Sequence, residues 1–293
     1  MGAMKTVVVT GAGGFLGRHV TAALATTWKI VPVVSRSGGR KGAIALDLTA
    51  PDAAKQLTDK LAGRKTDAVI HLASVMCTPE NSRDWRLLTG NMAMARAVTE
   101  ACRIIKPAVL VHASSIAVYP CRDGLYREDS PVDMSGNGDA LYGLAKFNAE
   151  MMFNFYLDSV TKVVNLRIAQ VYGPGMRPDR ILPALKSEWR KAGTLTVFGN
   201  GERVVNFIHV EDVVRTIAAV LKKPKAGTYN VAHARNDNLR SVARAMIREC
   251  GAGKIVTVGK GSRARQRISA DRLKHDYNLV LTRQNFHGIG GAS

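Results

Sequence analysis

The chain has 293 residues, of which 46% are hydrophobic and 22% charged, and a formal net charge of +19 at pH 7. This length suits one large α/β domain, or a nucleotide-binding domain with a smaller appendage. We find no apolar run of the ~18 residues that a membrane helix needs, no signal peptide, and no cysteine pair or histidine cluster at metal-binding spacing. We therefore expect a cytoplasmic protein without a structural metal.

A strand and a glycine-rich turn open the chain. Residues 7–10 read Val-Val-Val-Thr, an apolar strand typical of the buried centre of a parallel sheet. Glycines follow at three-residue spacing, and then a helical stretch runs to about Thr26. Such a turn lets a pyrophosphate approach the backbone closely, and the helix N-terminus offers it unpaired N–H groups. The sequence thus predicts a dinucleotide site formed by Gly11, Gly13, Gly14, Phe15, Leu16 and Gly17.

The next two strand ends bear on the choice of cofactor. A strand over residues 29–34 ends in Ser35 and Arg36, without the carboxylate that would bind the ribose 2′-hydroxyl of NAD. Ser35 and Arg36 match a 2′-phosphate better, so we favour NADP over NAD. A third strand ends at Asp47 and Leu48, where the carboxylate could accept the adenine amino group.

A fourth strand over residues 67–73 ends in small residues that would let the chain pass beneath a cofactor. We expect His71 in this strand to be packed and hydrogen-bonded rather than catalytic.

Two predicted helices, 90–105 and 142–157, are apolar on most sides. One apolar stripe is enough for a helix to cover a sheet. The additional apolar surface of these helices therefore predicts pairing with a second copy of the chain as a homodimer.

The predicted catalytic groups come from a strand end and a helix. The strand 109–115 ends in Ser114 and Ser115, and ligands of open parallel sheets sit at such carboxyl ends. Tyr142 and Lys146 lie about one helical turn apart, on the same face. A lysine cation favours the phenolate and makes the tyrosine a better acid or base. We therefore place Ser115 against the substrate oxygen with which Tyr142 exchanges a proton.

A sixth strand is predicted over residues 163–172, after which proline, glycine and basic residues become more frequent. This change suggests a dinucleotide-binding domain over 1–173 and a substrate-binding region over 174–281 that is interleaved with the main sheet. Residues 282–293 are predicted to be a disordered tail.

The basic excess lies mainly in residues 222–283, which contain 15 Lys and Arg against 4 Asp and Glu. Nucleic-acid binding is one interpretation. Arg240, Arg244 and Arg248, however, recur at helical spacing opposite Val242 and Met246, as on a solvent-exposed helix face. We favour attraction of an anionic small-molecule substrate, or simple solubility.

Together these motifs resemble the extended short-chain dehydrogenase/reductases, and more narrowly the NAD-dependent epimerase/dehydratase family, which acts largely on nucleotide sugars. The resemblance runs from Thr6 to about Val231. It includes the segments 10–17, 71–73, 114–115, 118–119, 142–146, 171–175 and 207–212, together with Asn91.

This resemblance implies a Rossmann-type, doubly wound parallel sheet with a smaller C-terminal substrate-binding region. It implies Tyr142 as the acid/base, Lys146 on the nicotinamide ribose and Ser115 polarising the substrate oxygen, while the cofactor supplies the hydride chemistry. It also implies cofactor contacts by Leu72, Ala73 and Asn91, and substrate contacts by Ser74, Ser115, Tyr142, Gln170 and Arg203.

Three positions depart from the family pattern. Dehydratases of the family have Asp-Glu after the catalytic hydroxyl, where this chain has Ile116 and Ala117, which disfavours 4,6-dehydration. Val205 stands where relatives place an arginine that grips the diphosphate, although Arg203 is a possible substitute. Gln170 stands where relatives often have asparagine.

The leading hypothesis is an NAD(P)-dependent epimerase or oxidoreductase of a sugar or nucleotide sugar. An NADP-dependent reductase of a non-sugar carbonyl compound and a non-catalytic dinucleotide-binding protein are the alternatives. The sequence leaves the substrate, the stereochemistry and the choice between epimerase and reductase open.

Overall fold

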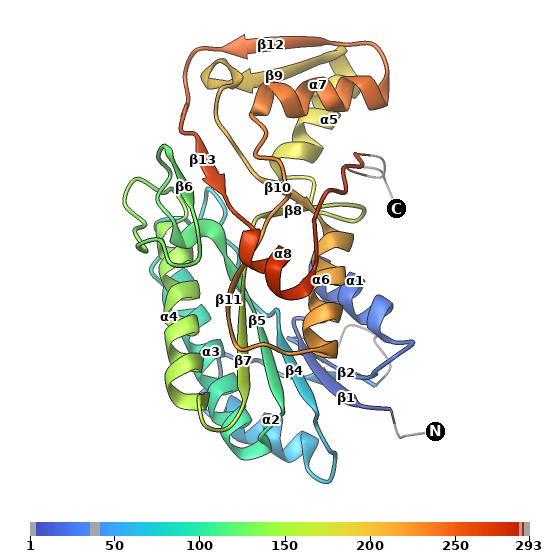
Figure 1. Ribbon diagram of the computed structural model, residues 1–293, viewed down its shortest axis with the longest axis vertical. Helices are drawn as coiled ribbons and strands as arrows, with labels where there is room; N and C mark the ends of the chain where they lie inside the picture. The colour runs from blue at the N-terminus through green and yellow to red at the C-terminus, as the bar shows by residue number, and fades with distance from the viewer. Residues whose placement is uncertain (1–3, 36–41, 287–288, 290–293) are drawn as a thin grey trace. The chain divides into compact units, whose positions relative to one another are not determined.

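The computed structural model describes residues 4–35, 42–286 and 289 (Figure 1). The chain forms two compact units, each built from three segments. Unit 1 comprises Met1–Tyr119, Val132–Arg167 and Val214–Tyr229, and unit 2 comprises Pro120–Pro131, Ile168–Val213 and Asn230–Ser293. A single boundary at residue 173 would place residues 120–131 in unit 1 and residues 214–229 in unit 2. The structure instead places residues 120–131 in unit 2 and residues 214–229 in unit 1.

Unit 1 is built on a seven-stranded sheet in the order β11-β7-β5-β4-β1-β2-β3. The strands are β1 (Thr6–Thr10), β2 (Lys29–Val34), β3 (Ile44–Ala45), β4 (Ala68–His71), β5 (Val109–Ser115), β7 (Lys162–Ile168) and β11 (Gly227–Val231). β1 pairs in parallel with β2 on one side and with β4 on the other. The chain order reverses between β1 and β4, and doubly wound folds bind ligands at the carboxyl ends of strands at such a reversal. The predicted Rossmann-type fold is confirmed.

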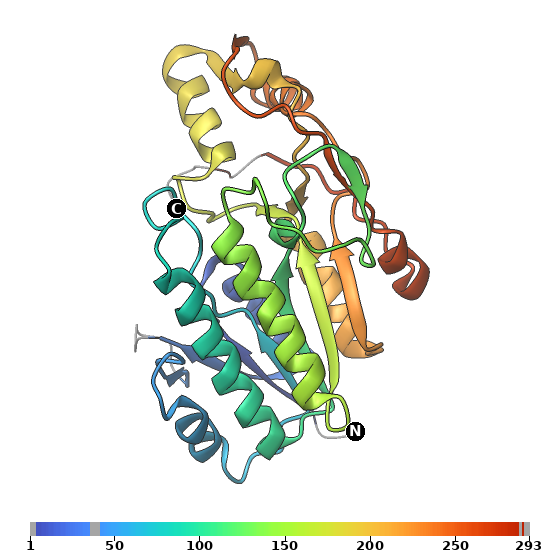
Figure 2. The ribbon, with the colours of Figure 1, turned by 90° about the vertical axis from the view of Figure 1, so that its left-hand side faces the viewer.

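Helices cover both faces of this sheet. α2 (Ala53–Leu61), α3 (Arg86–Ile105) and α4 (Ala140–Leu157) lie on one face, with α3 and α4 side by side (Figure 2). α1 (Phe15–Leu24) and α6 (Val210–Lys222) lie on the other face (Figure 1). No helix in the described ranges has both the length and the apolar character of a membrane span.

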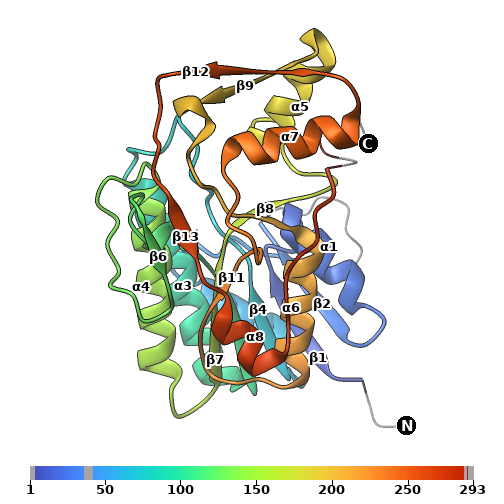
Figure 3. The same ribbon diagram turned by 45° about the horizontal axis from the view of Figure 1, so that its top comes forward.

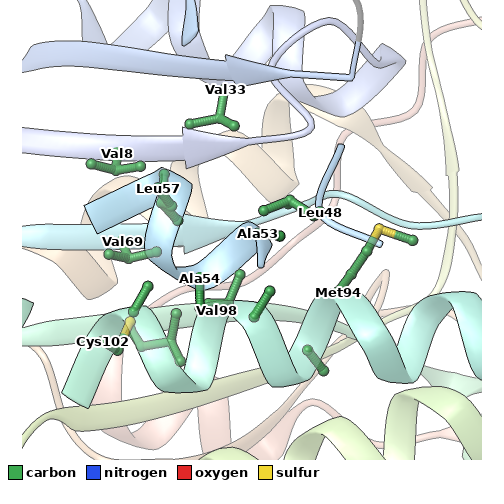
Figure 4. Packing of buried hydrophobic residues seen from close by; sticks show 14 of the residues in the cluster. Val8, Val33, Leu48, Ala53, Ala54, Leu57, Val69, Met94, Val98 and Cys102 are labelled. Carbon is green, nitrogen blue, oxygen red and sulfur yellow. The ribbon is translucent and has the colours of Figure 1, made fainter. Parts of the chain in front are cut away.

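The core beneath α2, α3 and α4 is apolar (Figure 4). Val8 and Val69 point from the sheet toward Leu57 of α2 and Val98 of α3, and all four are buried. Burying a side chain of this size contributes about 1.5–3 kcal/mol, so the strands and helices stabilise one another.

Unit 2 contains three two-stranded parallel sheets and shorter helices. The strand pairs are β8 (Gln170–Tyr172) with β10 (Phe207–His209), β9 (Thr194–Phe198) with β12 (Lys254–Val258), and β6 (Gly124–Tyr126) with β13 (Gln266–Ile268). The helices are α5 (Ile181–Ala192), α7 (Leu239–Cys250) and α8 (Asp271–Tyr277). Figure 3 shows β9 and β12 running together beside α5 and α7. Tyr172, Leu195, Val242 and Met246 belong to the core of this unit.

Most predicted elements appear within a few residues of their expected bounds, but the single strand over 163–172 is wrong. The chain instead forms β7 in the large sheet and β8 in a separate pair, with a break at Ala169. The Ala169 N–H donates to the Val231 carbonyl at 2.9 Å, and the Gln170 N–H donates to the Asn206 carbonyl at 3.0 Å. This change of hydrogen-bonding partner separates β8 from the large sheet and pairs it with β10 instead.

Part of the predicted disordered tail is held in unit 2. The Phe286 N–H donates to the Glu249 carboxylate at 2.7 Å, and its carbonyl accepts from Lys186 Nζ at 2.8 Å. The Phe286 ring is buried and stacks on Tyr172. The tail is thus anchored as far as Phe286, while residues 287–288 and 290–293 lie outside the described residues.

Candidate active site

The turn between β1 and α1 has the backbone shape expected of a pyrophosphate site. Gly11 has φ +68°, and a Cβ there would come within 2.6 Å of the Ala73 nitrogen. A Cβ on Gly17 would overlap the Gly11 carbonyl. Gly13 and Gly14 are exposed, and Gly14 is the N-cap of α1 and has no side chain to occupy the N–H groups of the first turn. The turn therefore leaves room and backbone donors for an anion, which fits a dinucleotide.

The predicted adenosine-side residues are only partly described. Ser35 is exposed at the end of β2, and Arg36 lies outside the described residues. Asp47 is exposed, and its carboxylate accepts from the Thr49 hydroxyl at 2.7 Å and the Thr49 N–H at 2.9 Å. These hydrogen bonds lower the pKa of Asp47. Leu48 is buried in the core beside it.

Asn91 of α3 holds the segment that follows β4. Its Oδ1 accepts from the Ser74 hydroxyl and the Val75 N–H, both at 2.9 Å, and its Nδ2 donates to the carbonyls of Val75 and Leu87. Asn91 is 6% exposed, so its polar atoms are engaged within the protein. Leu72, Ala73 and Ser74, each half-buried, are thereby held where the chain leaves the sheet. Their contacts with cofactor and substrate remain predictions.

Tyr142 and Lys146 are both buried on α4, and Lys146 Nζ lies 5.4 Å from the centre of the Tyr142 ring. Ser115 ends β5, and its Oγ accepts from the Ala117 N–H at 3.1 Å, which caps the short helix η1 (Ile116–Val118). A Cβ on Gly143 would overlap the Ala117 carbonyl, so only glycine lets α4 approach η1 this closely. This approach places Tyr142 against the residues that follow Ser115.

The Tyr142 hydroxyl has an apolar neighbour. It lies 3.5 Å from the sulfur of Met76, a weak acceptor, and the ring packs in a buried cluster with Cys77, Leu87 and Ala117. A substrate oxygen would be a far better partner for this hydroxyl than the thioether.

Burial shapes the electrostatics around Lys146. Desolvation lowers the pKa of Lys146 to about 8, an effect that the charge of Glu150 opposes. Two imidazoles lie near it: the rings of His71 and His112 stack at 5.8 Å, and both are buried. Burial and then the Lys146 charge lower the pKa of His71 to about 3 and that of His112 well below its ordinary value. His71 is hydrogen-bonded to the Thr10 hydroxyl at 2.8 Å, as the packed, non-catalytic interpretation predicts.

The residues predicted from the C-terminal part belong to unit 2. Gln170 is exposed on β8, Arg203 is half-buried, and Val205 is buried in the core of that unit. Substrate contacts of Gln170 and Arg203 stay predictions.

Sequence reasoning missed a buried charged cluster in unit 1. Glu150 and Arg167 are 2% and 4% exposed, and they form a two-pronged ion pair. Two signals were present in the sequence: Glu150 lies one turn beyond Lys146, and Arg167 is a charged residue between Leu166 and Ile168 in a predicted strand. Since buried charges are rare unless paired, a charged residue in a buried strand indicates a partner elsewhere in the fold but does not identify it.

Comparison with known proteins identifies the family. The model of the NAD dependent epimerase/dehydratase family matches residues 7–232. The chain belongs to this family. Among the described residues, no group of three His, Cys, Asp or Glu side chains is arranged to hold a metal.

Individual relatives differ in their reactions. An uncharacterised UDP-glucose epimerase of Bacillus subtilis is 27% identical over 243 residues, which cover 74% of this chain and 73% of that protein. A dTDP-4-dehydro-6-deoxy-D-allose reductase of Streptomyces bikiniensis is 24% identical over 278 residues, which cover 88% of this chain and 85% of that protein. The structure of MoeE5 in complex with UDP-glucose and NAD has a TM-score of 0.81 at 24% identity, over 97% of this chain and 96% of that one, and supports the fold.

Proposed function

We propose that this protein is an NAD(P)-dependent epimerase or oxidoreductase of a nucleotide sugar, with Ser115, Tyr142 and Lys146 as its catalytic residues. The main support is the buried pair on α4, in which Lys146 Nζ lies 5.4 Å from the Tyr142 ring, together with the glycine turn of an NAD-dependent family. A nicotinamide bound along the turn would supply the hydride chemistry.

The protein's own groups position the substrate and move a proton. The Tyr142 phenolate takes a proton from the substrate hydroxyl during oxidation, and the Tyr142 phenol gives one to the substrate oxygen during reduction. The Lys146 ammonium favours the phenolate form of Tyr142 and would hold the nicotinamide ribose of a bound cofactor. The Ser115 hydroxyl, at the end of β5, donates a hydrogen bond to the same substrate oxygen.

We propose epimerisation or reduction rather than 4,6-dehydration. Ile116 and Ala117 follow Ser115, and both are buried and apolar in η1. Neither can supply the carboxylate that removal of water would need. The relatives include both an epimerase and a reductase, so either reaction is compatible with the family.

For the ligands, we propose NADP over NAD and an anionic nucleotide sugar. Ser35 and Arg36 support the first preference, and the net charge of +19 supports the second. A second candidate is reduction of a non-sugar carbonyl compound, which is favoured by the burial of Val205 where family members would bind a diphosphate.

Turnover by the Tyr142→Phe variant tests the proposal. The purified protein is assayed with NAD and NADP in parallel against UDP-glucose and other sugar nucleotides. Absorbance at 340 nm records net oxidation or reduction, and chromatography of the sugars detects epimers. Loss of the proton-transferring hydroxyl is expected to lower kcat by at least ~100-fold while cofactor binding stays within a few-fold.

The matched control is Tyr156→Phe, which removes the same atom from an exposed tyrosine of the same helix and should leave kcat unchanged. An undiminished kcat in Tyr142→Phe would refute the role of Tyr142.

A further inference from the structure

Four buried polar side chains form a connected cluster in unit 1. Arg167 of β7 donates from Nε and Nη2 to the Glu150 carboxylate at 3.0 and 2.8 Å, and from Nη1 to the Tyr119 hydroxyl at 2.9 Å. The Ser114 hydroxyl donates a short hydrogen bond to the same carboxylate. All four residues are at most 4% exposed.

The cluster joins the segments that bear the proposed catalytic residues. Ser114 immediately precedes Ser115 on β5, Tyr119 follows the η1 helix that Ser115 caps, and Glu150 lies one turn beyond Lys146 on α4. Glu150 therefore holds α4 to the end of β5. Displacing its carboxylate would release both sides of the site.

Glu150 is also the anion that acts on Lys146. The titratable groups around this part of α4 include Tyr142 and Glu150 on the helix, together with His71, Cys77, His112, Tyr119 and Arg167 from the elements and segments packed against it. The two histidines are neutral near pH 7, because burial lowers their pKa values. Burial also lowers the pKa of Lys146, and the charge of Glu150 opposes that effect.

Stability alone is a poor explanation for this arrangement. Removing two charges from water costs several kcal/mol for each ion, and replacing a buried ion pair by apolar residues is often neutral or stabilising. An apolar contact between α4 and β7 would join them as well. What an apolar pair would lack is a negative charge beside Lys146.

We propose that Glu150, clamped by Arg167 and Ser114, is a positioning residue that keeps the buried Lys146 side chain charged next to Tyr142. This inference rests on the proposed role of Lys146. It assigns to the Arg167–Glu150 pair a part in setting the protonation of the active site in addition to joining α4 to the sheet.

The test is the titration of Lys146 in the protein without added substrate or cofactor. Lysine is labelled with ¹³C at Cε, and the Lys146 signal is assigned by its loss in Lys146→Met. In Glu150→Gln, which keeps the shape of the side chain but removes its charge, the midpoint of the titration should fall by ~1 pH unit or more. Glu100→Gln removes an exposed carboxylate of α3 and should leave the midpoint unchanged.

A double variant tests the proposal if Glu150→Gln alone does not fold. Glu150→Gln/Arg167→Met removes both members of the ion pair, so no unpaired charge remains buried, and it should fold. Its Lys146 midpoint should still fall, because Lys146 responds to the charge of Glu150. A wild-type midpoint in either folded variant would overturn the proposal. Because the readout is a protonation equilibrium, this outcome is separate from an absence of enzymatic turnover.

Discussion

His71 and His112 are two histidines held neutral inside unit 1. Their rings stack on each other, and each makes a T-shaped contact with the Phe153 ring. Nδ1 of His71 is hydrogen-bonded to the Thr10 hydroxyl, and Nδ1 of His112 is hydrogen-bonded to Asn165 Oδ1. The Nε2 atom of His112 has no partner among the described atoms. Protonating either ring in the fold would bury a cation next to Lys146, so the folded protein resists it.

Acid stability should reflect these two residues. An unfolded histidine binds a proton near pH 6.5, whereas the folded protein holds the pKa of His71 at about 3. The unfolded state therefore binds more protons below pH 6.5, and the free energy of unfolding should fall as pH decreases from there. Each histidine contributes a slope that approaches about 1.4 kcal/mol per pH unit well below pH 6.5 and is about half of that at pH 6.5.

Urea unfolding between pH 4.5 and 6.5 measures that slope. His112→Phe should reduce the slope of the free energy of unfolding against pH by the contribution of one histidine. His275→Gln, which changes a ring exposed to solvent, should not reduce this slope. An equal slope in wild type and His112→Phe would contradict this account.

Some residue pairs of the candidate site could be predicted from the sequence, and others could not. Tyr142 and Lys146 follow from helical spacing within one short segment, so local sequence was enough to pair them. The Arg167–Glu150 pair joins a strand to a helix, and Asn91 bonds to Val75 across a loop. Such partners depend on how distant segments pack, which no local pattern encodes.

Among the secondary-structure elements, the contact between α4 and η1 depends on a single missing side chain. Gly143→Ala would place a methyl group against the Ala117 carbonyl, a backbone atom that cannot turn aside. We expect a loss of about 1–3 kcal/mol in the free energy of unfolding, as for other overpacked sites. A lower kcat should accompany it, because α4 carries Tyr142.

Gly90→Ala on α3 is the matched control. A Cβ there would meet only Val75 Cγ2 at 3.8 Å, an ordinary contact, and alanine favours the helix by ~1 kcal/mol over glycine. This variant should therefore be as stable as wild type or more so. Thermal unfolding of the two proteins side by side gives the comparison, and equal stability of Gly143→Ala and wild type would exclude the tight contact.

The strands were predictable where they contain a short apolar run, as at residues 7–9 of β1 and 109–111 of β5. The split between β7 and β8 was not, because residues 163–172 contain no glycine or proline that would mark a break. Ala169 still donates to Val231 of β11, a strand that the sequence did not reveal, whereas Gln170 donates to Asn206, and this change of partner marks the break. Hydrogen-bond partners brought by the fold decide this boundary.

For the molecule as a whole, an apolar surface on α4 supports the proposed homodimer. Phe155 is 79% exposed, Tyr156 meets its ring edge-on, and Met151 lies exposed one turn earlier. Large exposed aromatic side chains that cluster on one helix are typical of protein interfaces. We propose a second copy of this chain as the partner of this surface.

Phe155→Asp should convert the dimer to a monomer, because a carboxylate at such an interface would lose its hydration. Sedimentation equilibrium measures the mass. Phe198→Asp makes the same change at an exposed phenylalanine of unit 2 and should leave the mass unaltered. A monomeric wild-type protein would refute the proposed homodimer.

The alternation of the chain between its two units has a consequence for dissecting the protein. The polypeptide passes from one unit to the other after residues 119, 131, 167, 213 and 229. No single cut therefore yields a fragment with all the strands of one unit and none of the other. A truncated chain ending at residue 173 would lack β11, the edge strand beside β7, and should be insoluble or prone to aggregate. In the intact chain, both units should unfold in one melting transition.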